Sequence, residues 1–235
     1  MSKYLDLLDN LSITHRLALI ITAAFFVRLY VVFNAVMIPP DSVTYLRLAS
    51  EFASGNYGEA FNVQRPPLYP FLISVSSYIF GDLEFSARIV SLVFGTLTIA
   101  TAFLIGKTVY DERTGLITAF LVAIHPYLIR YSGDALTEGL YHFTFSIAVL
   151  ASMKGAIERS PRWMIAAGFF VLLTYMTKPS GLGILFVTSL WILLYKPFSI
   201  KEDWGERLKL LLSGWLIFII LALPYLVFLF TQTGE

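Results

Sequence analysis

The sequence predicts an all-α integral membrane protein, from its composition, its recurring apolar runs and the placing of its basic residues. Of the 235 residues, 57% are hydrophobic and 14% are charged, against about 25% charged in an ordinary soluble domain. The mean hydropathy is +0.73. This composition excludes a soluble globular domain, a disordered chain and a nucleic-acid binder with a basic face. The chain contains no cysteine, which excludes disulfides and thiolate sites.

We expect about seven transmembrane helices, because a spanning helix needs roughly 20 apolar residues. An eighth apolar stretch, residues 66–81, begins with two prolines and is short enough to form a partial helix that does not cross. The seven predicted spans cover residues 17–40, 89–106, 114–129, 139–153, 163–177, 181–195 and 210–234. Together they form a single polytopic membrane domain over residues 1–235.

The basic residues predict the orientation of this domain. Lysine and arginine gather in the N-terminal tail and in residues 107–113, 154–162 and 196–209, and such loops face the cytoplasm. With seven crossings, and with residues 66–81 not crossing, all four regions share one side. We therefore expect a cytoplasmic N-terminus. The opposite face, periplasmic, extracellular or lumenal, then carries the remaining charges.

The first outer loop, residues 39–66, predicts an interfacial helix over residues 42–54. Asp41 can cap its start and Gly55 can end it. An apolar stripe would lie in the membrane interface, formed by Val43, Leu46, Ala49 and Phe52. On this loop alone, Asp41 reads as a cap as readily as a reactive group. Arg65, just before Pro66, fits either a lipid-headgroup contact or a bound phosphate.

Two further regions of the outer face carry charge. Arg130, Asp134 and Glu138 step by four and would share one helix face. They fit either an Arg130–Asp134 ion pair with Glu138 in water, or a polar cavity facing Asp41. Lys178 lies at a break between two apolar runs, where it fits a snorkelling lysine or a phosphate ligand.

The pattern resembles the N-terminal membrane module of the GT-C superfamily of glycosyltransferases. It is most similar to the dolichyl-phosphate-mannose protein mannosyltransferase group and its aminoarabinose-transferase-like relatives. The resemblance covers nearly the whole chain and rests on the order of several short motifs. These are Pro39-Pro40-Asp41-Ser42, residues 64–70, residues 87–95, residues 106–115, His125-Pro126 leading to Glu138, Thr177-Lys178-Pro179 and Leu223-Pro224-Tyr225.

The resemblance implies transfer of a sugar from a polyprenyl-phosphate-linked donor to an unidentified acceptor on the outer or lumenal face. Asp41 would be the general base, and Glu138 the second acidic group of the catalytic pair. Arg65 stands where a lysine is common in the family and would bind the donor phosphate. The other candidate substrate- or phosphate-binding residues are Tyr69, Arg130, Asp134 and Lys178. Some GT-C relatives need a divalent metal ion and others do not, and no motif here supports a metal site.

Members of the family continue well beyond this length, so we expect the C-terminal module of the family to be absent. The alternative to an enzyme is therefore a non-catalytic polyprenyl-phosphate-binding or assembly subunit that retains the GT-C scaffold. A second membrane subunit is a further partner to consider beside the membrane lipids. A transporter is disfavoured because the charged residues gather at one face instead of at mid-bilayer.

Overall fold

The computed structural model describes residues 11–35, 38–62, 64–194 and 204–233. Within these ranges the chain forms helices and turns and no strand, which confirms the all-α fold class. The elements are α2 (Ile13–Asn34), α3 (Pro40–Ala53), α4 (Tyr57–Ala60), α5 (Leu68–Phe80), α6 (Leu83–Val109), α7 (Glu112–Ile124), α8 (Pro126–Tyr131), α9 (Glu138–Ile157), α10 (Pro161–Tyr175), η1 (Pro179–Leu182), α11 (Gly183–Leu194) and α12 (Trp204–Thr233).

Four helices of the described chain, α2, α6, α9 and α12, are long and apolar enough to cross a membrane. Helices α10 and α11 are apolar but shorter, and α7 has 13 residues. The count of seven spans therefore stays a prediction. The predicted span over residues 114–129 is wrong as one helix, because α7 ends at Ile124 and α8 starts at Pro126. Proline lacks an N–H and disfavours a helical residue before it.

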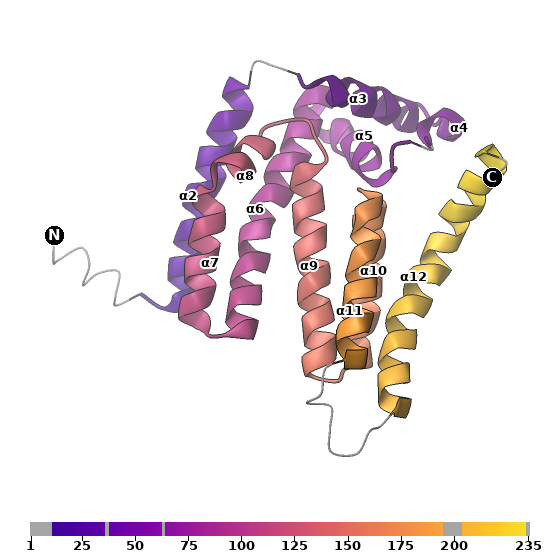
Figure 1. Ribbon diagram of the computed structural model, residues 1–235. Coiled ribbons are helices and arrows are strands. Elements are labelled where there is room, and N and C mark those ends of the chain that lie inside the picture. Colours follow the sequence, from indigo (N-terminus) through magenta and orange to yellow (C-terminus); the bar gives the residue numbers. More distant parts are fainter. Residues whose placement is uncertain (1–10, 36–37, 63, 195–203, 234–235) are drawn as a thin grey trace.

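The long helices lie side by side, and α3, α4 and α5 lie across one end of them (Figure 1). We call this the polar end; it also contains the turn from α8 to α9 and the turn from α10 to η1. The turns from α6 to α7 and from α9 to α10 lie at the opposite end. The basic stretches 107–113 and 154–162 are thus separated from the outer-face charges, as expected. Which end faces the cytoplasm stays a prediction.

The interfacial helix is present as α3, with two differences from the prediction. It begins at Pro40, whose fixed φ suits the first helical turn, so Pro39 takes the cap position and Asp41 makes no cap hydrogen bond. The helix ends before Gly55, which has φ +77° and so favours glycine. Val43 is exposed, and the buried face of α3 consists of Ser42, Tyr45, Leu48, Ala49 and Phe52.

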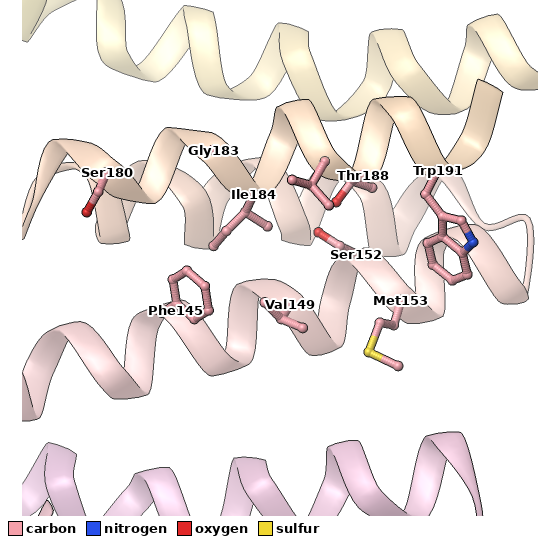
Figure 2. A pocket seen from close by; sticks show the side chains of 10 residues that line it. Phe145, Val149, Ser152, Met153, Ser180, Gly183, Ile184, Thr188 and Trp191 are labelled. Carbon is pink, nitrogen blue, oxygen red and sulfur yellow. The ribbon is translucent and has the colours of Figure 1, made fainter. Parts of the chain in front are cut away.

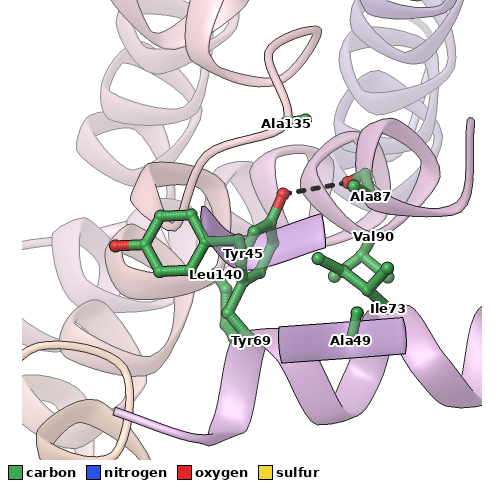
Figure 3. Packing of buried hydrophobic residues seen from close by; sticks show 8 residues of the cluster. All are labelled: Tyr45, Ala49, Tyr69, Ile73, Ala87, Val90, Ala135 and Leu140. Atoms are coloured by element: carbon green, nitrogen blue, oxygen red, sulfur yellow. Dashed lines mark hydrogen bonds between the residues drawn. The ribbon is translucent and has the colours of Figure 1, made fainter. Parts of the chain in front are cut away.

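Helix α5 is the predicted partial helix. Its 13 residues span about 20 Å at 1.5 Å each, well short of the roughly 30 Å of a bilayer core. It packs against α3 and α6 at the polar end. Residues from α3, α5, α6, α9 and the turn before α9 form one buried cluster there (Figure 3): Tyr45, Ala49, Tyr69, Ile73, Ala87, Val90, Ala135 and Leu140.

Two buried arginines hold the ends of other helices. Arg28 is fully buried and donates to the carbonyl oxygens of Val122 (3.2 Å) and Ala123 (3.1 Å). The break at Pro126 leaves carbonyls at the end of α7 without helical partners, and Arg28 supplies them with donors. Arg88 likewise donates to Val32 and Ala35 at the end of α2. Arg28 therefore has a structural place, bound to the carbonyl oxygens at the end of α7.

Candidate functional site

The first charged pair, Asp41 and Arg65, joins α3 to the segment before α5. Arg65 Nη2 donates to Asp41 Oδ1 at 2.7 Å, and the two side chains are 33% and 59% exposed. Arg65 Nη1 donates to the Tyr45 hydroxyl at 3.2 Å, and the guanidinium lies 5.3 Å from the centre of that ring. Asp41 is in the first turn of α3, where the helix dipole favours a carboxylate. Asp41 therefore meets a guanidinium that Tyr45 already holds in place.

The second pair joins α9 to the turn after α10. Lys178 Nζ lies 2.8 Å from Glu138 Oε1, and the side chains are 36% and 23% exposed. Glu138 Oε2 is buried and has no hydrogen-bond partner in the described chain. The lysine nitrogen also lies 5.5 Å from the centre of the Tyr141 ring. This carboxylate therefore has one oxygen bound to a cation and one acceptor still open.

Two glycines allow the second pair to form. A Cβ on Gly139 would lie 2.6 Å from the carbonyl oxygen of Ser91 on α6, so only glycine lets the start of α9 approach this closely. A Cβ on Gly181 would lie 2.5 Å from Thr174 Cγ2. That glycine lets the turn containing Lys178 fold back against α10.

The third charged group is the turn between α8 and α9. Arg130 Nε lies 3.6 Å from Asp134 Oδ2, with Arg130 exposed and Asp134 largely buried. Burial raises the pKa of Asp134, although Arg130 and Arg88 act in the opposite direction. Because α8 ends at Tyr131 and α9 begins at Glu138, the three charges do not stack on one helix. The Arg130–Asp134 pair forms, but Glu138 binds Lys178 instead of lying in water.

Backbone and tyrosine contacts connect the Asp41–Arg65 pair with the Glu138–Lys178 pair. The N–H of Leu68 donates to the carbonyl oxygen of Met176 at 3.0 Å, which joins the segment after Arg65 to the segment before Lys178. The rings of Tyr45 and Tyr69 pack edge to face at 5.4 Å. The four side chains therefore gather at the polar end although they come from four separate parts of the chain.

Tyr69 is fully buried and lies beneath this site. Its hydroxyl donates to the carbonyl oxygen of Ala87 at 3.2 Å (Figure 3), and it contacts Ser91 Oγ at 3.0 Å. Ser91 in turn donates to the carbonyl oxygen of Leu136, two residues before Glu138. Tyr69 thus connects the two pairs from inside and offers no exposed surface to a ligand.

The sequence motifs did not single out Tyr45, which contacts Arg65 directly. A signal was available, because Tyr45 follows Asp41 by four residues and so lies on the same face of the helix. Within the described residues, no group of three histidine, aspartate or glutamate side chains could hold a metal ion.

A family model described as dolichyl-phosphate-mannose-protein mannosyltransferase matches residues 64–228, which is more than half of the chain. The chain belongs to this family. It is thereby a member of the GT-C superfamily, as the resemblance of its motifs implied. The matched region contains Arg65, Glu138 and Lys178 and begins after Asp41.

Two curated relatives are similar to this mannosyltransferase-family chain. An uncharacterized protein of Aquifex aeolicus is 23% identical over 209 residues, covering 74% of this chain and 42% of the relative. An undecaprenyl phosphate-alpha-4-amino-4-deoxy-L-arabinose arabinosyl transferase of Pseudomonas fluorescens is 24% identical over 211 residues, covering 83% and 37%. The chain therefore spans less than half the length of these relatives.

The fold is similar to a solved structure of the same superfamily. The crystal structure of the Archaeoglobus fulgidus oligosaccharyltransferase in the apo form matches with a TM-score of 0.69 and 18% identity. The match covers 88% of this chain and 29% of the archaeal one. At this identity the likeness establishes the arrangement of the helices alone.

Proposed function

We propose that the polar end transfers a sugar from a polyprenyl-phosphate-linked donor to an acceptor hydroxyl. The observation that carries this proposal is the exposed pair of Asp41 and Arg65, 2.7 Å apart, at the end of the helices that α3–α5 cover. Membership of a mannosyltransferase family supports it. The name of the Pseudomonas relative supports an undecaprenyl-phosphate type of donor.

Arg65 and Lys178 would bind the donor phosphate. Each cation is about one-third exposed and each now binds one carboxylate, so a phosphate can take the place of that carboxylate without breaking any helix. A guanidinium can also bind two phosphate oxygens at once. As the sugar leaves, negative charge grows on the phosphate, and fixed positive groups stabilise that charge.

Asp41 would act as the general base. The acceptor oxygen forms a bond to the anomeric carbon while the bond from that carbon to the phosphate oxygen breaks. The phosphate leaves with the electron pair, and the hydroxyl proton passes to the Asp41 carboxylate. A single displacement of this kind inverts the anomeric centre. The exposure of Asp41 leaves it open to an acceptor from outside.

Glu138, Asp134 and Arg130 would complete the site. The buried Oε2 of Glu138 has no hydrogen-bond partner in the described chain, so this carboxylate can accept a hydrogen bond from a sugar hydroxyl once a phosphate has replaced it on Lys178. The Arg130–Asp134 pair lies on the turn that leads into Glu138, so its place is at the rim, where an exposed guanidinium can meet a substrate or a lipid headgroup.

The Asp41→Asn variant tests the proposal in membranes supplied with undecaprenyl-phosphate-linked aminoarabinose or dolichyl-phosphate mannose. We expect sugar transfer to fall roughly 10²- to 10⁴-fold, the usual contribution of a general base, while binding of undecaprenyl phosphate is retained. Glu51→Gln is the matched control, because Glu51 lies on the same helix and binds Asn56. Equal transfer by the Asp41→Asn variant and the wild type would refute the base assignment. A wild type that binds undecaprenyl phosphate but transfers no sugar would indicate a binding subunit.

A further inference from the structure

Lys178 has a second partner besides the carboxylate that it binds. Among the described residues, its ammonium lies 2.8 Å from Glu138 Oε1 and 5.5 Å from the centre of the Tyr141 ring. A cation over an aromatic face is attracted by the electrons of the ring. Glu138 and Tyr141 are three positions apart at the start of α9, so they share one face of that helix. The lysine therefore meets one charged and one neutral group from the same helix.

The Tyr141 ring is itself held on several sides. Its hydroxyl lies 3.1 Å from Ser180 Oγ, and its ring packs against that of Phe145, with 5.6 Å between the two centres. Figure 2 shows Phe145 and Ser180 at the same end of the apolar cavity between α9 and α11. The backbone N–H of Tyr141 donates to the carbonyl oxygen of Thr137 at 2.8 Å. The ring therefore presents a fixed face to the turn that contains Lys178.

The lysine side chain needs such a support because it is long and flexible. The backbone of Lys178 is held, since its N–H donates to the carbonyl oxygen of Thr174 at 2.8 Å. A flexible four-carbon stem separates that backbone from the ammonium. Fixing the stem costs conformational entropy, and a ligand must meet this cost unless the protein has already fixed the side chain.

The neutral partner can stay on the ammonium when a phosphate binds. A phosphate on Lys178 repels the Glu138 carboxylate, because the two carry charge of the same sign. The aromatic ring of Tyr141 has no such conflict. The ammonium also has three N–H donors, so it can bind phosphate oxygens while it remains on the face of the ring.

We propose that Tyr141 is a positioning residue, which holds the Lys178 ammonium at the phosphate site after Glu138 has been displaced. The inference rests on the proposed function and adds to it a residue that acts through Lys178 and does not touch the reacting atoms. Its contribution is to keep the ammonium in place, so its loss weakens the binding of the phosphate.

The other charged pair shows which part of the tyrosine matters here. Tyr45 contacts the guanidinium of Arg65 with its hydroxyl as well as with its ring. The hydroxyl of Tyr141 lies against Ser180 instead, so only the ring face of Tyr141 meets the cation. A phenylalanine at this position keeps that face and should preserve the function.

The test measures the binding of undecaprenyl phosphate to the full chain in phosphatidylcholine nanodiscs. Tyr141→Leu removes the aromatic face, and binding should weaken about two- to fivefold, the fold-change that corresponds to an exposed cation–π contact. Tyr141 is partly exposed, so this variant can fold. Tyr141→Phe keeps the face and should bind like the wild type.

The matched control is Tyr78→Leu. Tyr78 is an exposed tyrosine on α5, and its hydroxyl also has a partner, the carbonyl oxygen of Ala53 at 3.2 Å. No cation lies over its ring in the part of the chain that the structure describes. Binding should therefore be unchanged in this variant, and a loss equal to that of Tyr141→Leu would overturn the proposal.

The Lys178→Gln background decides whether the effect of Tyr141 passes through the cation. With no ammonium left for the ring to hold, Tyr141→Leu should cause no further loss of binding there. A tyrosine that only packs the helices would give the same loss in both backgrounds, and that result would overturn the proposal. A Tyr141→Phe variant as weak as Tyr141→Leu would also overturn it, because the hydroxyl would then matter and not the ring face.

These measurements separate the positioning role from the proposed function. If Lys178→Gln weakens binding and Tyr141→Leu does not, the phosphate site at Lys178 stands and the positioning role is wrong. If Lys178→Gln binds like the wild type, or the wild type does not bind undecaprenyl phosphate, the phosphate assignment of Lys178 is itself wrong. The positioning role then falls with it.

Discussion

The molecule holds its cations in two different ways. Arg28 and Arg88 are buried, and both donate to carbonyl oxygens at the ends of neighbouring helices; Arg88 also pairs with Glu84 on its own helix. Arg65 and Lys178 are about one-third exposed at the polar end, and each binds a carboxylate. All four are costly charges in a chain with few of them, yet only the second two can exchange partners.

The difference shows that scarcity of charge alone does not mark function. A buried guanidinium bound to helix carbonyls cannot release them without exposing unsatisfied backbone groups. A partly exposed cation such as Arg65 or Lys178 can release its carboxylate to water and bind a phosphate. The partner and the exposure of each cation therefore distinguish a structural cation from one that can bind a ligand. Four measurements test this distinction.

The largest effect is expected for Arg65→Leu. Loss of one fixed group that stabilises developing charge costs roughly 10²- to 10³-fold in rate, so sugar transfer should fall by that factor. The melting temperature should move by less than about 4 °C, because exposed ion pairs contribute roughly 0–1 kcal/mol. Arg65→Lys, which keeps the charge, should recover part of the rate. A large loss of melting temperature in Arg65→Leu would place Arg65 with the structural arginines.

For Arg28→Met we expect a large loss of thermal stability. It leaves the carbonyl groups of Val122 and Ala123 at the end of α7 without their donors, and each buried unsatisfied group costs about 1–3 kcal/mol. We expect the melting temperature in detergent to fall by about 10 °C, as followed by a thermal-shift assay. Arg130→Met is the control, because Arg130 is exposed and should change little. An unchanged melting temperature in Arg28→Met would contradict the structural role.

A smaller effect is expected for the pair of Glu138 and Lys178. A double-mutant cycle with Glu138→Gln and Lys178→Gln should give a coupling of about 0.2–1 kcal/mol in thermal stability, the range of exposed pairs. Binding of undecaprenyl phosphate should respond differently: Lys178→Gln weakens it and Glu138→Gln does not. Strong stability coupling with no change in binding would make this pair a structural one.

The smallest effect is expected for Asp134. Because burial raises its pKa above the unfolded value of about 3.9, the folded state holds its proton to a higher pH than the unfolded state does. Its contribution to stability is therefore most favourable below that unfolded value and declines as pH rises through the folded pKa. The wild type should gain stability relative to Asp134→Asn as the pH is lowered toward 4. A difference that stays constant between pH 4 and 8 would contradict the raised pKa.

The sequence was enough to predict the fold class and most of the polar end. Composition and the clustering of basic loops predicted helices whose charges separate between two ends, because both signals are local. The interfacial helix was placed within two residues, since Pro40 and Gly55 mark its limits. The partial helix at residues 66–81 followed from its short length, its two opening prolines and the agreement of the basic loops on one side.

The pairings could not be predicted in this way. Arg65 meets Asp41 across 24 positions and Lys178 meets Glu138 across 40, and nothing in a local pattern specifies contacts of that range. Pro126 marked a break in the apolar run, but the sequence did not show what satisfies the carbonyl groups that the break leaves free. The structure shows that Arg28 binds them. The role of Arg88 likewise depends on where α2 ends relative to α6.

One backbone hydrogen bond links the two segments that contain Arg65 and Lys178. Pro66 and Pro67 have no N–H, so the amide of Leu68 is the first donor after Arg65, and it binds the carbonyl of Met176 two residues before Lys178. A bond between main-chain atoms survives nearly every side-chain replacement. Side chains around the two cations can therefore be replaced while this main-chain link between their segments stays in place.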